Sequence, residues 1–337
     1  IEQNSPSSSE EGLFIGMKFD REVCAVVEYL KSEQGKIVRL DSACPGCWIN
    51  LINPTNAEVE DVISSQELDA GFVRAALDPE ESSRVELEDD QALLIVDIPV
   101  EEESDSITRD VQIYATLPMG IVVSDQVVVT VCLEDTSVTR DIASGKIVRG
   151  IQTAMRTRFV FQLLLRVAGR FLNYLHRIER SFNEIERRLY DSQENEDLMQ
   201  LLGLQKSFVY FSASLKGNEV TMEKVLRGRI LKLYDDDRDL LEDALIEIRQ
   251  AIEMSGIYST ILAGTMEAYA SVVSNNMNDI MKALTVITLI MTIPNMVFGF
   301  YGMNVSYLPG AVSFIPAIVS IVACVIAWRF LKKHKLY

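Results

Sequence analysis

The C-terminal part of the chain contains an unbroken stretch of 46 residues, 283–328, without a single Asp, Glu, Lys or Arg. A hydrocarbon core about 30 Å thick is crossed by roughly 20 helical residues, so this stretch supplies two membrane spans. The tetrapeptide Tyr301-Gly302-Met303-Asn304 lies near its middle and predicts the break between them. We therefore expect a helical hairpin, with a first span at 280–301, an external loop at 302–310 and a second span at 311–329.

Charge at the two ends of this hairpin predicts its orientation. The tail at 330–337 is basic, with Lys332, Lys333 and Lys335, whereas the external loop carries no charge. The positive-inside rule places such a tail in the cytoplasm, and two spans then put the N-terminal part on the same side. We expect a multi-pass protein of the cytoplasmic membrane with both termini inside. Residues 1–15 are rich in Ser and Glu, lack the apolar stretch of a signal peptide, and are expected to be disordered.

The composition restricts the partners of the chain. Its formal net charge is −17, and a surface of that sign repels nucleic acid and anionic lipid but attracts cations. Nucleic acid is therefore not expected as a partner. Solubility alone would also explain the acidity, so the charge does not by itself establish a role in cation handling.

Cysteine usage gives little support to a disulfide framework or to a zinc site. The five cysteines are odd in number and widely spread. Cys44 and Cys47 form a CxxC pair, but structural zinc needs four ligands, and His176 and His334 lie far away in the sequence. A redox pair and two idle thiols in a reducing cytosol both stay open. No nucleophile, base and metal-ligand set emerges from the motifs, so an enzyme is the weakest interpretation.

Residues 16–150 predict a cytoplasmic α/β domain with a mixed or antiparallel sheet. Short β-rich runs alternate with turn signals at 23–27, 36–40, 92–98, 110–116 and 126–133. Two short helices are expected at 56–66 and 67–77, and Pro79 prevents the second from continuing.

Residues 151–279 predict long cytoplasmic helices that form a stalk. The first has an apolar face at helical spacing, which comprises Phe161, Leu164, Leu165, Ala168, Leu172, Leu175, Ile178, Phe182, Ile185 and Leu189. A second is expected at about 194–215, followed by a turn at Gly217 and Asn218 and a shorter helix to about 232. A third begins near Asp235 and runs straight into the first span. Because a lone helix of that length is unstable in water, it should pack against other helices.

Polar and small residues recur along the first span at alternating intervals of three and four. This stripe comprises Asn278, Met281, Thr285, Thr288, Thr292, Asn295 and Gly299, and the positions between them are almost all apolar. Lipid offers hydroxyl and amide groups no partner, so the stripe should face protein or water. It predicts either the lining of a pore or a seam where two helices pack closely. A pore requires several copies of the chain, since one hairpin cannot enclose it. The same spacing continues upstream through Glu267, which could meet cations below the membrane.

The second span is apolar all round and shows no polar stripe. This composition is typical of a helix in an outer, lipid-facing ring. Trp328 is expected at the membrane interface, next to the basic tail.

The segment Tyr301-Gly302-Met303-Asn304, at the end of the first of two C-terminal spans behind a large acidic domain, resembles the CorA family of magnesium transporters. Pro294 and the stretch 278–285 also look like the pore-helix entrance of that family. The resemblance implies a homopentamer with a funnel-shaped cytoplasmic part, whose first spans line the pore and whose second spans surround it. It implies Mg²⁺ as both the transported and the regulatory ion, without an organic cofactor.

The same resemblance assigns roles along the pathway. Gly302, Met303 and Asn304 would form the selectivity mouth, where Asn304 could hold a largely hydrated ion because Mg²⁺ releases water reluctantly. Asn278, Met281 and Leu284 would form the inner constriction, where apolar rings can gate by dewetting. The stripe itself puts Met281 on the pore axis but Leu284 nearer its flank.

The resemblance also implies regulatory carboxylates at subunit interfaces. Asp243 falls where one of them is expected on the long helix, although an ordinary solvated helix face would look the same. The position of its partner is occupied by Ala75, so Asp78, Glu80 or Glu81 would have to substitute. The external loop also lacks the acidic residues that many relatives carry.

We expect a channel for influx of hydrated divalent cations, gated by cytoplasmic Mg²⁺ bound at acidic subunit interfaces. A transporter of Zn²⁺, Co²⁺ or Ni²⁺ from the same family is the nearest alternative. The scarcity of His and paired Cys near the span disfavours a site that dehydrates soft metals. A non-conducting membrane-anchored sensor or scaffold is the alternative from another class.

Overall fold

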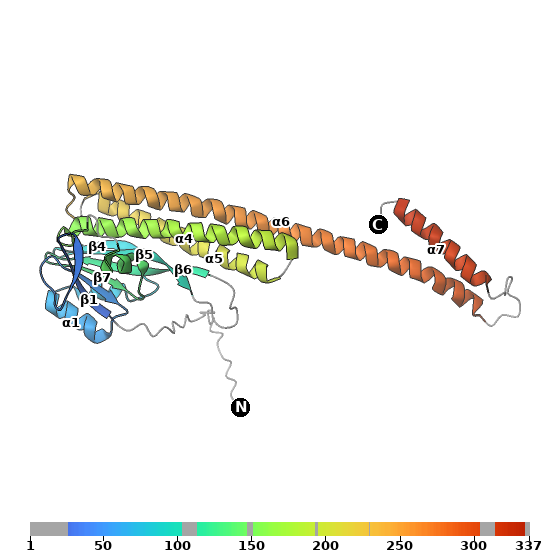
Figure 1. The fold of residues 1–337 in the computed structure, drawn as a ribbon, viewed down its shortest axis with the longest axis horizontal. Coiled ribbons are helices and arrows are strands. Elements are labelled where there is room, and N and C mark those ends of the chain that lie inside the picture. Colours follow the sequence, from blue (N-terminus) through green and yellow to red (C-terminus); the bar gives the residue numbers. More distant parts are fainter. Residues whose placement is uncertain are drawn as a thin grey trace, which may run out of the picture. The chain divides into compact units, whose positions relative to one another are not determined.

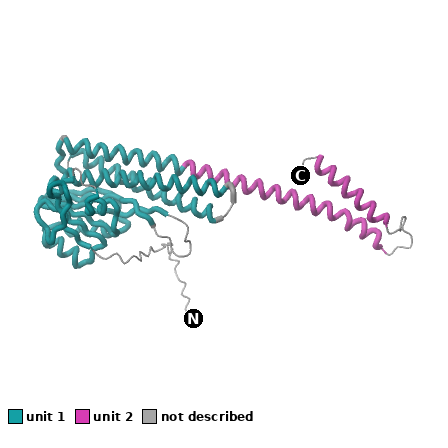
Figure 2. Tube along the Cα trace, viewed as in Figure 1, with its two compact units in different colours: residues 1–259 teal, residues 260–337 magenta. Residues whose placement is uncertain are grey.

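The computed structural model describes residues 26–102, 113–146, 151–192, 195–228, 230–303 and 314–333. The chain divides into two compact units, residues 1–259 and residues 260–337 (Figure 2). The expected disordered stretch 1–15, Asn304 and the rest of the loop up to residue 310 lie outside the described residues.

The first unit contains a seven-stranded sheet with the strand order β2-β1-β3-β7-β6-β5-β4. Its strands are β1 (Val26–Glu33), β2 (Lys36–Leu40), β3 (Trp48–Ile52), β4 (Arg84–Glu88), β5 (Gln91–Glu102), β6 (Ile113–Val123) and β7 (Val128–Cys132). β3 and β7 pair in parallel, with Trp48 opposite Val128, and the other neighbours pair antiparallel. The mixed sheet predicted from the sequence is confirmed.

The central strand β3 was not among the expected strands. All five of its residues are buried, so its sequence lacks the apolar-polar alternation that marks a half-exposed strand. Edge strand β4 was also missed.

Helices cover both faces of the sheet (Figure 1). α1 (Asn56–Gln66) and α2 (Ala70–Ala75) pack on one face, over a core that includes Ile49 and Val129. Thr55 starts α1 through a capping box with Glu58, and Asp69 caps α2, which explains why two short helices form here.

The other face of the sheet carries long helices. α4 (Arg156–Ser192) and α5 (Asn195–Leu226) pack on it, and α3 (Ser137–Ala143) packs on α4. The ring centroids of Trp48 in β3 and Phe159 in α4 are 5.2 Å apart. Further along, Phe171 of α4 meets Phe211 of α5 edge-to-face, also at 5.2 Å. Of the ten residues predicted for the apolar face of this helix, eight are buried, and Leu165 and Leu172 are half-buried, so the predicted face is confirmed as a buried one.

α5 continues through Gly217 and Asn218, so the turn predicted there is wrong. A Cβ at Gly217 would lie 3.1 Å from Ser83 Oγ, and glycine therefore lets the helix approach the sheet closely. Asn218 is fully buried, and its amide pairs with the backbone of Asp97. Two residue types that are typical of turns serve here in a helix–sheet contact.

α6 (Asp235–Tyr301) is a single helix of 67 residues that begins where the sequence predicted. In the first unit it packs on α5, where the rings of Phe208 and Tyr258 stack with centroids 6.3 Å apart. The second unit comprises the remainder of α6 and the final helix α7 (Ile315–Lys333). The expected fold class, an α/β domain followed by long helices and a two-helix hairpin, is confirmed.

Candidate ion pathway

Two helices are long and apolar enough to cross a membrane. The most apolar 18-residue windows of α6 and α7 have mean hydropathies of 1.8 and 1.9. Protein buries only 6% of either window, whereas the core helix of a soluble protein would be mostly covered. Trp328 near the end of α7 has the Lys332 ammonium 5.2 Å from its ring centroid, an arrangement suited to the membrane interface.

The polar stripe occupies one side of α6. At about 100° per residue, the seven residues of the stripe span an arc of about 100°, and Leu284 extends it to about 120°. Asn278 and Leu284 lie at its two edges, and Met281 lies at its centre. All eight pore-lining candidates are exposed within the single chain: Asn278, Met281, Leu284, Thr285, Thr288, Thr292, Asn295 and Gly299.

The opposite side of α6 is the one that α7 contacts. Val286 is only 8% exposed, and Ile290, Ile293 and Val297 are half-buried. The Cys324 thiol of α7 donates a hydrogen bond to the carbonyl of Ile290, with 3.6 Å between sulfur and oxygen. Because these residues centre on the side away from Met281, α7 leaves the polar stripe uncovered.

This thiol contact compensates for a proline. Pro294 lies inside α6 and has no N–H to donate to the carbonyl of Ile290, four residues earlier. In a bilayer no water can replace the missing donor. Cys324 is the group that approaches the orphaned carbonyl, so α7 satisfies a defect in the neighbouring helix. This pair is not predicted by the sequence analysis, although Pro294 and the small residues around Cys324 are the features that point to it.

α7 approaches α6 through small side chains. Pro316 and Ser320 are buried, and Ala323, Cys324 and Ala327 are half-buried. Most of its large apolar residues are exposed, among them Ile318, Ile321, Val322, Val325 and Ile326. Small residues at this spacing let two membrane helices approach closely. The apolar second span therefore has a distinct packing face that its overall hydropathy concealed.

The threonines of the stripe donate their hydroxyl protons to the backbone of their own helix. Thr285, Thr288 and Thr292 each donate to the backbone carbonyl four residues earlier, at 2.8, 2.8 and 2.7 Å between oxygens. A hydroxyl has one proton and two acceptor lone pairs, so each oxygen keeps acceptor capacity on its exposed side. The water ligands of a hydrated cation are hydrogen-bond donors. The stripe is thus chemically suited to contact such an ion without replacing its waters.

The described part of the expected mouth is the end of α6. The Gly302 amide donates to the Phe298 carbonyl at 2.8 Å, and the Met303 amide donates to Phe300 at 3.4 Å. The Met303 side chain is exposed. Asn304 lies outside the described residues, so the geometry of the mouth stays a prediction.

The candidate regulatory carboxylates lie apart in the chain. Asp243 is exposed on α6, one turn before Glu247. Burial, and next the charge of Asp243, raise the pKa of Glu247, while Arg166 opposes the shift. Asp78 is exposed after α2 and accepts the Glu80 amide at 3.0 Å, and Glu267 is exposed on α6 in the second unit.

These carboxylates do not form a metal site within one chain. Over the described residues, no group of three or more His, Cys, Asp or Glu could hold a metal ion. Of the proposed substitutes, Glu81 pairs with Arg84, whose hydrogen bond lowers the pKa of the carboxyl. Regulatory roles for Asp243, Asp78 and Glu267 stay predictions that require a second chain.

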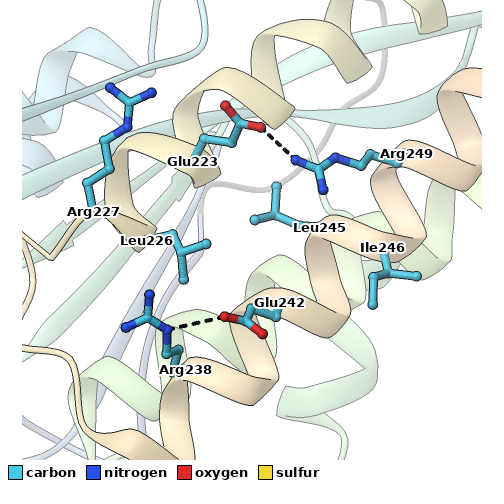
Figure 3. Close-up of a pocket in the computed structure, with 8 residues that line it drawn as sticks. All are labelled: Glu223, Leu226, Arg227, Arg238, Glu242, Leu245, Ile246 and Arg249. Atoms are coloured by element: carbon cyan, nitrogen blue, oxygen red, sulfur yellow. Dashed lines mark hydrogen bonds and ion pairs between the residues drawn. The ribbon is translucent and has the colours of Figure 1, made fainter.

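A groove of about 490 Å³ lies between the end of α5 and the start of α6 (Figure 3). Arg249 bonds Glu223 at 2.6 Å and Arg238 bonds Glu242 at 3.2 Å, as the dashed lines mark. Because its acidic groups are engaged by arginines, the groove presents no free carboxylate pair to a cation. We assign it no role in ion passage.

These features define a membrane protein with two C-terminal helices behind an α/β domain, and with a polar side left open on the first helix. The family description "CorA-like Mg2+ transporter protein" matches residues 46–333, and the chain belongs to this family.

Individual relatives agree with this assignment. The chain is 28% identical over 271 residues to the cobalt/magnesium transport protein CorA of Methanocaldococcus jannaschii, covering 78% of this chain and 81% of the relative. It is 33% identical over 119 residues to the protein of the same name from Thermotoga maritima, covering 31% of this chain and 33% of the relative. The complete structure of the CorA magnesium transporter from M. jannaschii superposes with a TM-score of 0.76 at 24% identity, covering 91% and 97% of the two chains.

Proposed function

We propose that several copies of this chain, five by the family resemblance, form a channel through which Mg²⁺ enters the cytoplasm. The observation that carries this proposal is the threonine stripe of α6, which α7 leaves uncovered in a member of a Mg²⁺ transporter family. Lipid would leave its acceptor oxygens unsatisfied, whereas a central aqueous path would hydrate them. Copies of α6 that turn this side inward would enclose such a path, with α7 outside.

Passage of the hydrated ion fits the chemistry of the stripe. Mg²⁺ prefers octahedral oxygen coordination and exchanges its water slowly, so a pore without fixed carboxylates avoids both dehydration and tight binding. None of the seven stripe residues is acidic. An inside-negative potential would drive entry with about 2.3 kcal/mol per elementary charge per 100 mV. Asn304 would contact the ion at the outer mouth, and Met281 with Leu284 would narrow the inner end.

Cytoplasmic Mg²⁺ would close this channel. Each chain carries a net charge of −17, so neighbouring copies repel one another unless cations lie between them. In this proposal Asp243 of one copy and Asp78 of the next share a Mg²⁺ ion, and Glu267 attracts ions nearer the membrane. Loss of these ions at low cytoplasmic Mg²⁺ would separate the copies and widen the constriction.

Mg²⁺ flux into proteoliposomes tests the pathway. We expect Thr288→Leu to lower the initial rate by at least about tenfold, the effect of about 1.4 kcal/mol on a barrier. Ile287→Leu is the matched control, because it places the same side chain one residue away on the apolar side of α6. Asn304→Ala should also reduce flux strongly. Unchanged flux in both Thr288→Leu and Asn304→Ala would favour a non-conducting sensor or scaffold.

Cobalt transport is a second candidate, because both curated relatives are named cobalt/magnesium transport proteins. Hydrated Co²⁺ could pass the same oxygen-lined path. Competition between Mg²⁺ and Co²⁺, Ni²⁺ or Zn²⁺ in the flux assay separates these ions. Inhibition of Mg²⁺ flux by Co²⁺, and of Co²⁺ flux by Mg²⁺, would support a shared path.

A further inference from the structure

The segment Cys44-Pro45-Gly46-Cys47, between β2 and β3, forms a tight turn that brings its two thiols together. The Cys47 amide donates to the Cys44 carbonyl at 3.1 Å, and Gly46 has a φ of +78°. Proline followed by glycine is typical of turns with a positive φ at the third position, and such turns hold their end α-carbons within about 7 Å. That separation overlaps the range that a disulfide spans. The Cys44 amide also lies 3.4 Å from Cys47 Sγ, so this sulfur points back over Cys44.

The two thiols differ in access. Cys44 is partly exposed, whereas Cys47 is fully buried. The Lys31 ammonium lies 3.5 Å from Cys44 Sγ, where it can stabilise negative charge on this sulfur during attack. Burial raises the pKa of the Cys47 thiol. Cys44 is accessible and lies beside a cation, which suits the thiol that attacks first. Cys47 is buried, which suits the resolving thiol.

The turn is held in place by segments distant in the sequence. The Gly46 amide donates to the Gln126 carbonyl at 2.7 Å, and the Thr153 hydroxyl donates to the Gly46 carbonyl at 2.8 Å. Closing a disulfide would therefore require mainly side-chain movement. A zinc site fits less well, because within the described ranges no third His, Cys, Asp or Glu completes a metal-ligand group.

We propose that Cys44 and Cys47 form a reversible dithiol–disulfide site that reacts with small cytoplasmic disulfides such as glutathione disulfide. The Cys44 thiolate attacks one sulfur of the small disulfide, whose S–S bond breaks and releases one small thiol after protonation. The Cys47 thiolate then attacks Cys44 Sγ, forms the Cys44–Cys47 bond and releases the second small thiol. The protein loses two electrons and two protons, and the small disulfide is reduced to two thiols.

Thiol trapping on the purified full-length protein tests this site. The protein is equilibrated with glutathione and glutathione disulfide at a series of ratios, alkylated and digested. We expect the peptide that contains Cys44 and Cys47 to shift from two alkyl groups to none, with loss of two hydrogens, while Cys132 and Cys324 stay alkylated after denaturation. Two alkylated thiols at every ratio would overturn the proposal.

Variants separate the two roles from a merely structural thiol pair. Cys47→Ser should accumulate a mixed disulfide between Cys44 and glutathione, whereas Cys44→Ser should not form one at Cys47. Lys31→Met should slow oxidation several-fold without changing the fully oxidised product. Thiols that become reactive only after a zinc chelator is added would instead identify a metal site and contradict the redox assignment.

Discussion

Single side chains join the long helices to the sheet, and Asn218 is the clearest case. Its Oδ1 accepts the Asp97 amide at 2.8 Å and the Ser83 hydroxyl at 3.1 Å, while its Nδ2 donates to the Asp97 carbonyl at 2.8 Å. All the polar atoms of a buried amide are thereby paired. Burial raises the pKa of the Asp97 carboxyl beside it, which hydrogen bonds from Ser214 and Ser83 partly offset.

We predict that Asn218→Ala loosens the contact between α5 and β5. Two backbone groups of Asp97 would lose their partner in a buried place, at a cost of roughly 3 kcal/mol. Hydrogen exchange of the β4 and β5 amides should accelerate accordingly. Lys216→Ala, at an exposed position on the same helix, should leave exchange almost unchanged. Equal protection in both variants would disprove the role of Asn218.

A second residue-scale contact is pH-dependent. The Tyr258 hydroxyl of α6 donates to Glu179 of α4, which lowers the pKa of Glu179 and raises that of Tyr258 to about 12. A depressed carboxyl pKa contributes stability above the unfolded value of 4.5, and this contribution is lost as pH falls through the folded value.

Tyr258→Phe should therefore speed hydrogen exchange in α6 around this position at neutral pH. The difference from the wild type should disappear in acid, once Glu179 is protonated in both folded and unfolded states. Glu179→Gln should abolish most of the pH dependence in the wild-type background. A difference that persists unchanged at acidic pH would assign the effect to packing instead.

At the scale of elements, α6 and α7 carry different kinds of side chain on their different sides. Most large apolar residues of α7 are exposed, its small residues face α6, and α7 leaves the polar side of α6 uncovered. The Ile290 carbonyl lacks its usual backbone donor because residue 294 is a proline, and it accepts a hydrogen bond from the Cys324 thiol at 3.6 Å. Within the hairpin α7 therefore covers one side of α6, and both the threonine stripe and the apolar flanks of α6 stay uncovered.

Cys324→Ala should weaken the hairpin by about 0.6 kcal/mol, the average for a hydrogen bond between membrane helices. Cys324→Ser should retain the stability, since a hydroxyl can donate to the same carbonyl. Unfolding by a denaturing detergent, followed through helix content, measures the difference. Val325→Ala, on the exposed side of α7, is the control. A midpoint for Cys324→Ala identical to that of the wild type would show that the thiol contact contributes nothing.

At the scale of the whole molecule, charge and assembly are coupled in our proposal. Copies with a net charge of −17 should associate more loosely when divalent cations are removed. Monovalent salt screens this repulsion as well but cannot bridge carboxylates of two chains.

We predict that chelating Mg²⁺ increases protease cleavage of the first unit, and that NaCl at equal ionic strength does not restore protection. Asp243→Asn should need more Mg²⁺ for the same protection, whereas Asp61→Asn, an exposed carboxylate on α1, should behave like the wild type. Cross-linking of the same samples counts the copies. Protection restored equally by Na⁺ would argue for screening rather than for bound Mg²⁺.

The sequence alone determined the features that depend on local chemistry or on the bilayer. A charge-free stretch long enough for two spans can fold in a membrane only as helices, and the start of α6 at Asp235 and the bounds of α1 followed from local signals. The polar stripe of α6 was visible because helical periodicity places its residues on one side. Its role, like those of Asn304 and Asp243, stays a prediction.

Only the tertiary structure decided which faces are covered. β3 is buried on both faces, so its sequence lacks the alternation of a half-exposed strand. Gly217 and Asn218 are residue types typical of a turn, but they lie within α5, where this helix contacts the sheet. Two contacts join residues far apart in the chain. The Cys324 thiol meets the carbonyl of Ile290, and the Lys31 ammonium meets Cys44. Local sequence cannot specify such contacts, because they depend on where a distant segment packs.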